Sequence, residues 1–374
     1  MTLSAAAPST GARSTLQLVD CDVHQEFNRW EDLRPYLGAA WWERIGPKGP
    51  PFGRRAYENV RGHIISEDMI NPKTGKAADD PAWVKQELCT KYGVDLGILT
   101  SNVLGLSSHP NTAMATAVAR AYNDWTLDVW VRPHREFKGS IIVAPQDTDG
   151  AVAEIERLGD DPGVVQVMIF SGAIEPYGRP RYHKIWEAAQ HYGLPVAMHS
   201  GGETVGIAPA GTLAGPLTYY VEHHALQTQS AQAHVVSMVM EGVFEKFPRL
   251  KFLVIEEGIS WVPHIMWRLD KDYKGNRSEC PWLKRLPSEY ILDHVRFSTQ
   301  PIDEPSKPEH LLQMFDMIEA QRTLLYASDY PHWDFDNPKV AFKDVPRELR
   351  RRIFVDNALD LYGDRLLAAP ASQM

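Results

Sequence analysis

The sequence predicts an α/β protein in which eight parallel strands, each followed by a helix, close into a (β/α)8 barrel. Three observations predict this fold. The chain has 374 residues, enough for one barrel of about 250 residues with insertions. Short apolar runs alternate with longer amphipathic stretches along nearly the whole chain, as they do in parallel sheets. Eight such runs can be counted, which favours the closed barrel over the alternative of an open, doubly wound sheet.

The candidate strands are the apolar runs bounded by turn residues. They cover residues 16–24, 94–101, 137–145, 164–171, 194–202, 251–258, 295–303 and 323–329. The candidate helices lie between them, at 111–131, 147–158, 181–192, 219–246, 260–272, 307–319 and 346–362. The last helix begins with Pro346 and ends before Gly363, residue types that favour those two positions.

Two segments do not fit this alternation. Residues 38–81, after the first strand, far exceed the usual loop of about 2–6 residues, so we expect an elaborated insertion near the mouth of the barrel. Residues 201–216 follow the fifth strand and are rich in Gly, Ala and Pro, which suits either a lid over a site or a plain surface loop. We expect residues 1–15 to be a disordered tail and residues 16–365 to form a single domain.

Charge and composition argue against several classes of partner. The chain carries 39 Lys and Arg against 48 Asp and Glu, a formal net charge of −9, with no basic block, so neither nucleic acid nor an anionic membrane surface is expected. No run approaches the about 20 apolar residues of a membrane span, and no secretory signal opens the chain. Cys21, Cys89 and Cys280 form neither a disulfide framework nor a zinc-finger pattern. We therefore expect a cytoplasmic protein.

The first candidate strand has polar and apolar side chains on opposite faces. In a barrel the apolar face packs against the helices, and the polar face points into the interior. Because an uncompensated buried carboxylate costs several kcal/mol, this face predicts a cationic partner or a bound divalent metal; a strand end that enters solvent is the alternative. Val19, Cys21 and Val23 form the apolar face, and Asp20, Asp22 and His24 form the polar one.

Other strand ends carry residues of the same chemistry. The fifth strand ends with His199 and the eighth with Asp329, at the end of the barrel where active sites form. With Asp22 and His24 they make a plausible set of four ligands for Zn²⁺ or Mn²⁺. A single His or Asp at a strand end is usually structural, but the convergence of several strand ends favours a site.

Five segments carry a resemblance to a known family: VDCDVH, PVAMHSGG, GVFEKFPRLKF, EEGISWVP and LLYASDYPH. Over residues 16–365 the sequence resembles the amidohydrolase superfamily, in particular the amidohydrolase-related branch of aminocarboxymuconate semialdehyde decarboxylase, γ-resorcylate decarboxylase and several lactone hydrolases and hydratases. The resemblance implies one divalent metal per chain, bound by Asp22, His24, His199 and Asp329. It also implies that Asp329 transfers a proton.

Two positions depart from the family pattern. Asp22 replaces the first His of the usual H-x-H motif, and the added charge favours Mn²⁺ over Zn²⁺. Glu256 stands where many members carry a catalytic His, so the role of that His does not transfer to this chain. Three roles remain open for Glu256: a metal ligand, an acid/base, or a group that orients a histidine. Relatives carry a His near the start of the long helix, where His224 matches better than His223.

Several other residues belong either to the site or only to the structural framework. His332 follows Asp329 closely and is expected beside the metal ligands. Aromatic residues near strand ends or in the insertion are either pocket walls or core, and arginines of the insertion either bind a substrate carboxylate or are solvated. These residues are Trp41, Trp42, Trp261 and Trp333, and Arg54, Arg55 and Arg61.

The sequence therefore predicts a metal-dependent enzyme that acts on a small carboxylated cyclic or unsaturated compound. The leading hypothesis is a non-oxidative decarboxylase with Asp329 as the proton donor. The alternative is a hydrolase that uses a metal-activated water against a lactone, ester or amide. A metal-free, non-catalytic barrel is a minor alternative, and relatives suggest a homodimer.

Overall fold

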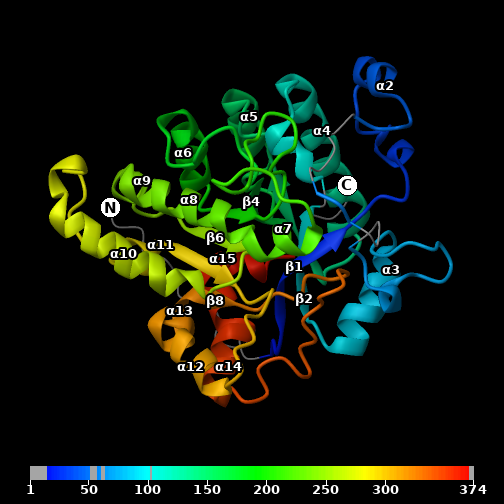
Figure 1. Cartoon of the computed structure of the whole chain (residues 1–374). Coiled ribbons are helices and arrows are strands. Elements are labelled where there is room, and N and C mark those ends of the chain that lie inside the picture. Colours follow the sequence, from blue (N-terminus) through cyan, green and yellow to red (C-terminus); the bar gives the residue numbers. More distant parts are fainter. Residues whose placement is uncertain (1–14, 51–56, 60–63, 102, 370–374) are drawn as a thin grey trace, which may run out of the picture.

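The computed structural model describes residues 15–50, 57–59, 64–101 and 103–369. These residues form an eight-stranded parallel sheet whose strands follow one another in chain order, and helices surround it (Figure 1). The strands are β1 (Val19–Gln25), β2 (Leu96–Ser101), β3 (Phe137–Ile142), β4 (Val164–Phe170), β5 (Val196–His199), β6 (Phe252–Ile255), β7 (Val295–Ser298) and β8 (Leu324–Leu325).

Hydrogen bonds between β1 and the segment after β8 close the sheet into a barrel. The amide of Cys21 donates to the carbonyl of Tyr326 at 2.9 Å, and the amide of His24 donates to the carbonyl of Tyr330 at 2.9 Å. Val23 and Tyr330 form a parallel bridge. The predicted (β/α)8 barrel is therefore confirmed, and the open sheet is wrong.

Several strands are shorter than the apolar runs predict, because the chain turns into the barrel mouth at their carboxyl ends. Asp329 has a φ of +57° and Glu256 a φ of +58°, backbone angles that residues other than Gly rarely adopt. Such conformations cost about 1–3 kcal/mol and persist where the surrounding structure enforces them, often at functional sites. The two strained residues are both candidates for the site.

The helices agree with the prediction in place but not always in length. The expected single helix over 219–246 is wrong: α7 and α8 meet at Gln227, and Gly242, with a φ of +73°, separates α8 from α9. The helix expected over 111–131 is an α-helix to Trp125 that continues as a π-helical segment. The α-helices are α2 (Ala39–Ile45), α3 (Pro81–Val84), α4 (Thr112–Trp125), α5 (Thr148–Leu158), α6 (His183–His191), α7 (Tyr220–Leu226), α8 (Thr228–Met240), α9 (Val243–Lys246), α10 (Trp261–Gly275), α11 (Pro287–His294), α12 (Pro308–Met317), α13 (Ala320–Thr323), α14 (Arg347–Arg351) and α15 (Asn357–Tyr362).

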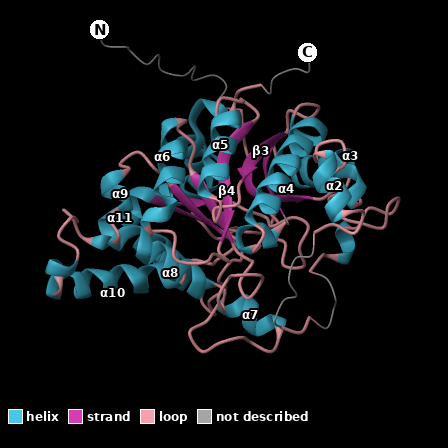
Figure 2. Cartoon of the chain, turned by 90° about the horizontal axis from the view of Figure 1, so that it is seen from above, coloured by secondary structure: helices cyan, strands magenta, loops and turns pink. Residues whose placement is uncertain are grey.

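The insertion after β1 covers the carboxyl ends of the strands. Ile65 forms a bridge with His332, and Glu58 forms one with Tyr219, just before α7. Figure 2 shows α7 among the long loops on one side of the barrel. These two bridges join the described part of the insertion to the segment after β8 and to the start of α7. No helix among the described residues is long and apolar enough to cross a membrane.

Candidate metal centre

The carboxyl ends of three strands bring together the four residues that the resemblance implies as ligands. Asp22 and His24 lie on β1, His199 ends β5, and Asp329 follows β8. One nitrogen or oxygen atom of each lies within 4.8 Å of the corresponding atoms of the other three, and all four residues are buried. Asp22 and His24 of β1 both join the cluster, although the pairing of β1 with β2 is irregular between Asp20 and Val23; Cys21 interacts with Tyr362 of α15.

Hydrogen bonds orient the two imidazoles for metal binding. Nδ1 of His199 donates to the carbonyl oxygen of Ser200 at 2.8 Å. The lone pair of Nε2 is then available to bind a metal, a common pattern in metal-ligating histidines. This Nε2 lies 3.5 Å from Oδ2 of Asp22. Nε2 of His24 lies 3.0 Å from Oδ1 of Asp329. Both imidazoles thus direct a nitrogen at a carboxylate of the cluster.

The cluster lacks a permanent cation among the described residues, where no Lys or Arg forms an ion pair with Asp22, Asp329 or Glu256. Burial raises the pKa of Asp329 well above its usual value, and the charge of Glu256 adds to this shift. Burial also acts to raise the pKa of Asp22, but the charges of His199 and His24 outweigh it and lower the pKa to about 2. Buried carboxylates without such a cation require a metal or a proton.

Two atoms of the cluster have no hydrogen-bond partner although they are buried: Oδ2 of Asp22 and Nε2 of His199. Burial lowers the pKa of His24 well below its usual value, which favours the neutral imidazole that binds metals. Two imidazole nitrogens and two carboxylates within 4.8 Å suit Zn²⁺ or Mn²⁺. The residues present therefore fit one divalent ion.

Glu256 also faces this site. Its Oε2 lies 3.2 Å from Nε2 of His199 and accepts a hydrogen bond from Oγ of Ser200 at 2.7 Å. Burial raises the pKa of Glu256 to about 7, against the opposing charge of His199. The neighbouring Glu257 is also buried. His332 lies beside the ligands as expected, with Nδ1 2.7 Å from Oδ1 of Asp329.

The two histidines of α7 take different places at the mouth. His223 stacks on Tyr57, with ring centroids 4.4 Å apart, and lines a small cavity of about 60 Å³ next to His199 and Glu256. The predicted lid segment, residues 201–216, lines the same cavity through Gly201, Gly202, Glu203 and Val205. His224 directs Nε2 at Oδ2 of Asp334, 3.2 Å away. Both histidines therefore lie near the site but outside the ligand cluster.

The aromatic candidates divide between mouth and core. Trp333 stands at the mouth, with its ring centroid 5.6 Å from that of His224. Trp261 is buried against Phe297, so its interpretation as a pocket wall is wrong. Trp41 and Trp42 belong to α2 in the insertion. Arg54, Arg55 and Arg61 lie outside the described residues.

The sequence reasoning missed three polar residues that support the site. Thr100, on β2, donates a hydrogen bond from its hydroxyl to Oδ1 of Asp22 at 2.5 Å. Nε2 of Gln300, just after β7, donates to Oδ2 of Asp329 at 3.2 Å and to Oδ2 of Asp334 at 2.8 Å. The rule that strand ends carry the site also applies to strands two and seven, and it would have found Thr100 and Gln300. Asp334 lies in a loop and has no such signal.

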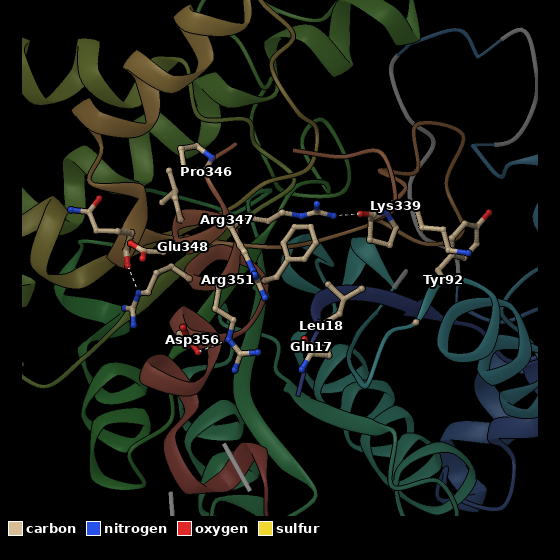
Figure 3. Close-up of a pocket in the computed structure, with 16 residues that line it drawn as sticks. Gln17, Leu18, Tyr92, Lys339, Pro346, Arg347, Glu348, Arg351 and Asp356 are labelled. Carbon is tan, nitrogen blue, oxygen red and sulfur yellow. Dashed lines mark hydrogen bonds and ion pairs between the residues drawn. The ribbon is translucent and has the colours of Figure 1, made fainter. Parts of the chain in front are cut away.

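A larger cavity, of about 1240 Å³, lies away from this cluster, at the amino-terminal ends of β1 and β2. Figure 3 shows Arg347 and Arg351 of α14 near Gln17 and Leu18, which precede β1. None of the predicted site residues lines it. The larger cavity therefore lacks the predicted chemistry, and the buried cluster remains the candidate functional site.

Comparisons with known proteins identify the family of the chain and agree with its barrel fold. A family model described as "Amidohydrolase" matches residues 103–363. Gamma-resorcylate decarboxylase from Polaromonas sp. is 22% identical over 298 residues, which are 74% of this chain and 85% of that protein. An amidohydrolase structure from Mycobacterium avium subsp. paratuberculosis matches with a TM-score of 0.69 and 20% identity, over 93% of this chain and 100% of that chain. A dihydroxybenzoic acid decarboxylase from Polaromonas sp. JS666, solved with manganese and 2-nitroresorcinol, has a TM-score of 0.64 and 17% identity, over 94% and 98% of the two chains.

Proposed function

The chain belongs to the amidohydrolase family, and from that premise we propose that it catalyses the non-oxidative decarboxylation of a small hydroxylated aromatic acid. It is a metal-dependent enzyme. The observation that carries the proposal is the buried cluster of Asp22, His24, His199 and Asp329. The decarboxylases of dihydroxybenzoate and γ-resorcylate among its relatives support the reaction and the substrate class.

In this proposal the four residues of the cluster hold one Mn²⁺ or Zn²⁺. When bound, the ion supplies a positive charge that attracts carboxylate and hydroxyl oxygens of the substrate. The protein's own residues then position the ring and move the proton. His224 and Trp333 stand at the mouth, where an imidazole donor and an indole suit the outer edge of an aromatic acid.

Asp329 is the proposed proton donor. Its carboxyl group gives a proton to the ring carbon that bears the carboxylate; the bond to the carboxyl carbon then breaks, its electron pair stays with the ring, and neutral CO₂ leaves. His332, whose Nδ1 lies 2.7 Å from Oδ1 of Asp329, is placed to return a proton to Asp329. Glu256, beside His199, is the second acid/base candidate of the site.

Isotopic labelling tests this reaction. The Mn²⁺-loaded protein is incubated with a panel of hydroxybenzoates in D₂O, and released CO₂ and the product are measured. Decarboxylation places one deuterium on the carbon that lost its carboxylate. Uptake of ¹⁸O from labelled water into a new carboxyl or hydroxyl group, without CO₂, would instead identify a hydrolase and overturn the proposal.

The substitution Asp329→Asn tests the proton donor. It should lower kcat by a factor of about 10² or more, because general acid catalysis typically contributes that much. Asp149→Asn is a matched control, since the Asp149 side chain is 84% exposed and pairs only with Lys184 among the described salt bridges. Activity of the Asp329 variant within a few-fold of the control, at equal metal content, would contradict the assignment.

A further inference from the structure

A helix and a loop at the barrel mouth meet through His224 and Asp334. His224 lies in α7, and its Nε2 is 3.2 Å from Oδ2 of Asp334, in the loop after β8. Both side chains are mostly buried, with exposed fractions of 16% and 14%. At this separation and burial, a carboxylate stabilises a protonated imidazole appreciably.

The carboxylate of Asp334 is fixed on its other side by Gln300. Nε2 of Gln300 donates to Oδ2 of Asp334 at 2.8 Å and to Oδ2 of Asp329 at 3.2 Å. A single amide group therefore links the proposed proton donor to the carboxylate that faces His224. This arrangement fixes the position of Asp334 relative to the cluster.

We propose that Asp334 is a positioning residue that keeps His224 protonated and holds it at the mouth of the site. There the imidazolium binds the substrate oxygen that lies farthest from the metal. The inference rests on the proposed function for the role of the substrate, but the pairing itself rests on the geometry alone. Among the described residues no Lys or Arg forms an ion pair with Asp334, so His224 is the cationic group that faces this carboxylate.

The carboxylates around His224 favour its protonated form. Burial alone lowers the pKa of His224, but the interactions with Asp334 and the charge of Glu256 outweigh burial, and the net shift is upward. Tyr220, one turn earlier on α7, and Trp333 pack against the ring, with centroids 5.6 Å away in each case. The carboxylates that face His224 thus come from the loops after β6 and β8.

Substitution of Asp334 by Asn tests the proposal, because it removes the charge and keeps the shape. The side-chain nitrogen signals of His224 are followed by NMR titration in the Zn²⁺-loaded protein, and His224→Asn identifies them. We expect the pKa of His224 to fall by about one unit or more in Asp334→Asn. As pH rises, kcat/KM of Asp334→Asn should begin to fall at a correspondingly lower pH than that of the wild-type protein. The metal content should be unchanged.

Asp303→Asn serves as the matched control, because Asp303 binds backbone amides at the same end of the barrel and does not contact His224. An unchanged titration of His224 in Asp334→Asn, at equal metal content and with an unchanged fold by circular dichroism, would overturn the pairing. If the wild-type protein decarboxylates none of the tested acids but the titration shifts as expected, the proposed function fails while the pairing stands.

Discussion

At the scale of single residues, the hydroxyl of Thr100 holds the carboxylate of Asp22, one of the proposed metal ligands. It donates to Oδ1 of Asp22 at 2.5 Å, and residues that hydrogen-bond to ligands usually tune metal affinity by a factor of about 10–100. Thr100→Val, which keeps the shape and removes the donor, should therefore weaken Mn²⁺ binding by about that factor.

Calorimetric titration of the metal-free protein measures this effect. Thr100→Ser keeps the hydroxyl and should restore most of the affinity. If the Val and Ser variants bind Mn²⁺ equally well, the hydrogen bond does not orient Asp22 for metal binding.

The same scale shows what the sequence could predict about the site. Asp22, His24 and His199 stand at the carboxyl ends of strands, where a barrel gathers its site, so their convergence could be predicted. The irregular pairing of β1 between Asp20 and Val23 could not be predicted from the alternation of side chains. Asp334 depends on the path of an irregular loop, and its contact with His224 joins segments more than a hundred residues apart. No local pattern encodes that contact.

At the scale of elements, the close approach of β4 and the segment after β5 shapes the site. Gly172 follows β4, and a Cβ atom there would lie 2.1 Å from the carbonyl carbon of Gly202 and 2.5 Å from the amide of Glu203. Because both neighbours are backbone, Gly172→Ala must push this segment away from β4. We expect a loss of about 1–3 kcal/mol in the free energy of unfolding.

The displaced segment follows His199 directly, so Gly172→Ala should also weaken Mn²⁺ binding. Urea denaturation and metal titration measure the two effects. Gly275→Ala is the matched control: a Cβ there meets nothing within 4 Å, and its effect should stay within about 1 kcal/mol. Equal stability of the two variants would show that the backbone tolerates the contact at Gly172.

Elements were easier to predict in number than in length. Each of the eight apolar runs contains a strand, because burial on both faces requires continuous apolar sequence in a parallel barrel. The run over 323–329 is a strand only at Leu324–Leu325, since the chain then turns toward Asp329. The break after α8 was missed because an isolated Gly is often tolerated inside a helix, and only the φ of +73° at Gly242 identifies it as an end.

At the scale of the whole molecule, metal binding should change how stability depends on pH. Burial raises the pKa values of Asp20 and Glu256 to about 7. These acids hold protons in the folded state that the unfolded chain has released, so the stability of the metal-free protein falls as pH rises from about 4 through 7. For His199, burial opposes ionisation but Asp22 and Glu256 raise its pKa to about 9, so its contribution is present below about 6.5 and is lost as pH rises through 9.

All three groups therefore act in the same direction in the metal-free protein, and a cation bound beside His199 and Glu256 replaces the protons that these two groups lose. Metal affinity also rises with pH, because the ligating imidazole must be neutral. We expect the increase in Tm on loading with Mn²⁺ to be larger at pH 8 than at pH 6. Calorimetry of loaded and chelator-treated protein measures this difference, and Asp22→Asn, which removes a ligand carboxylate, should reduce it at both pH values. An increase in Tm that stays constant or shrinks between pH 6 and pH 8 would mean that the buried carboxylates are balanced by something other than the metal.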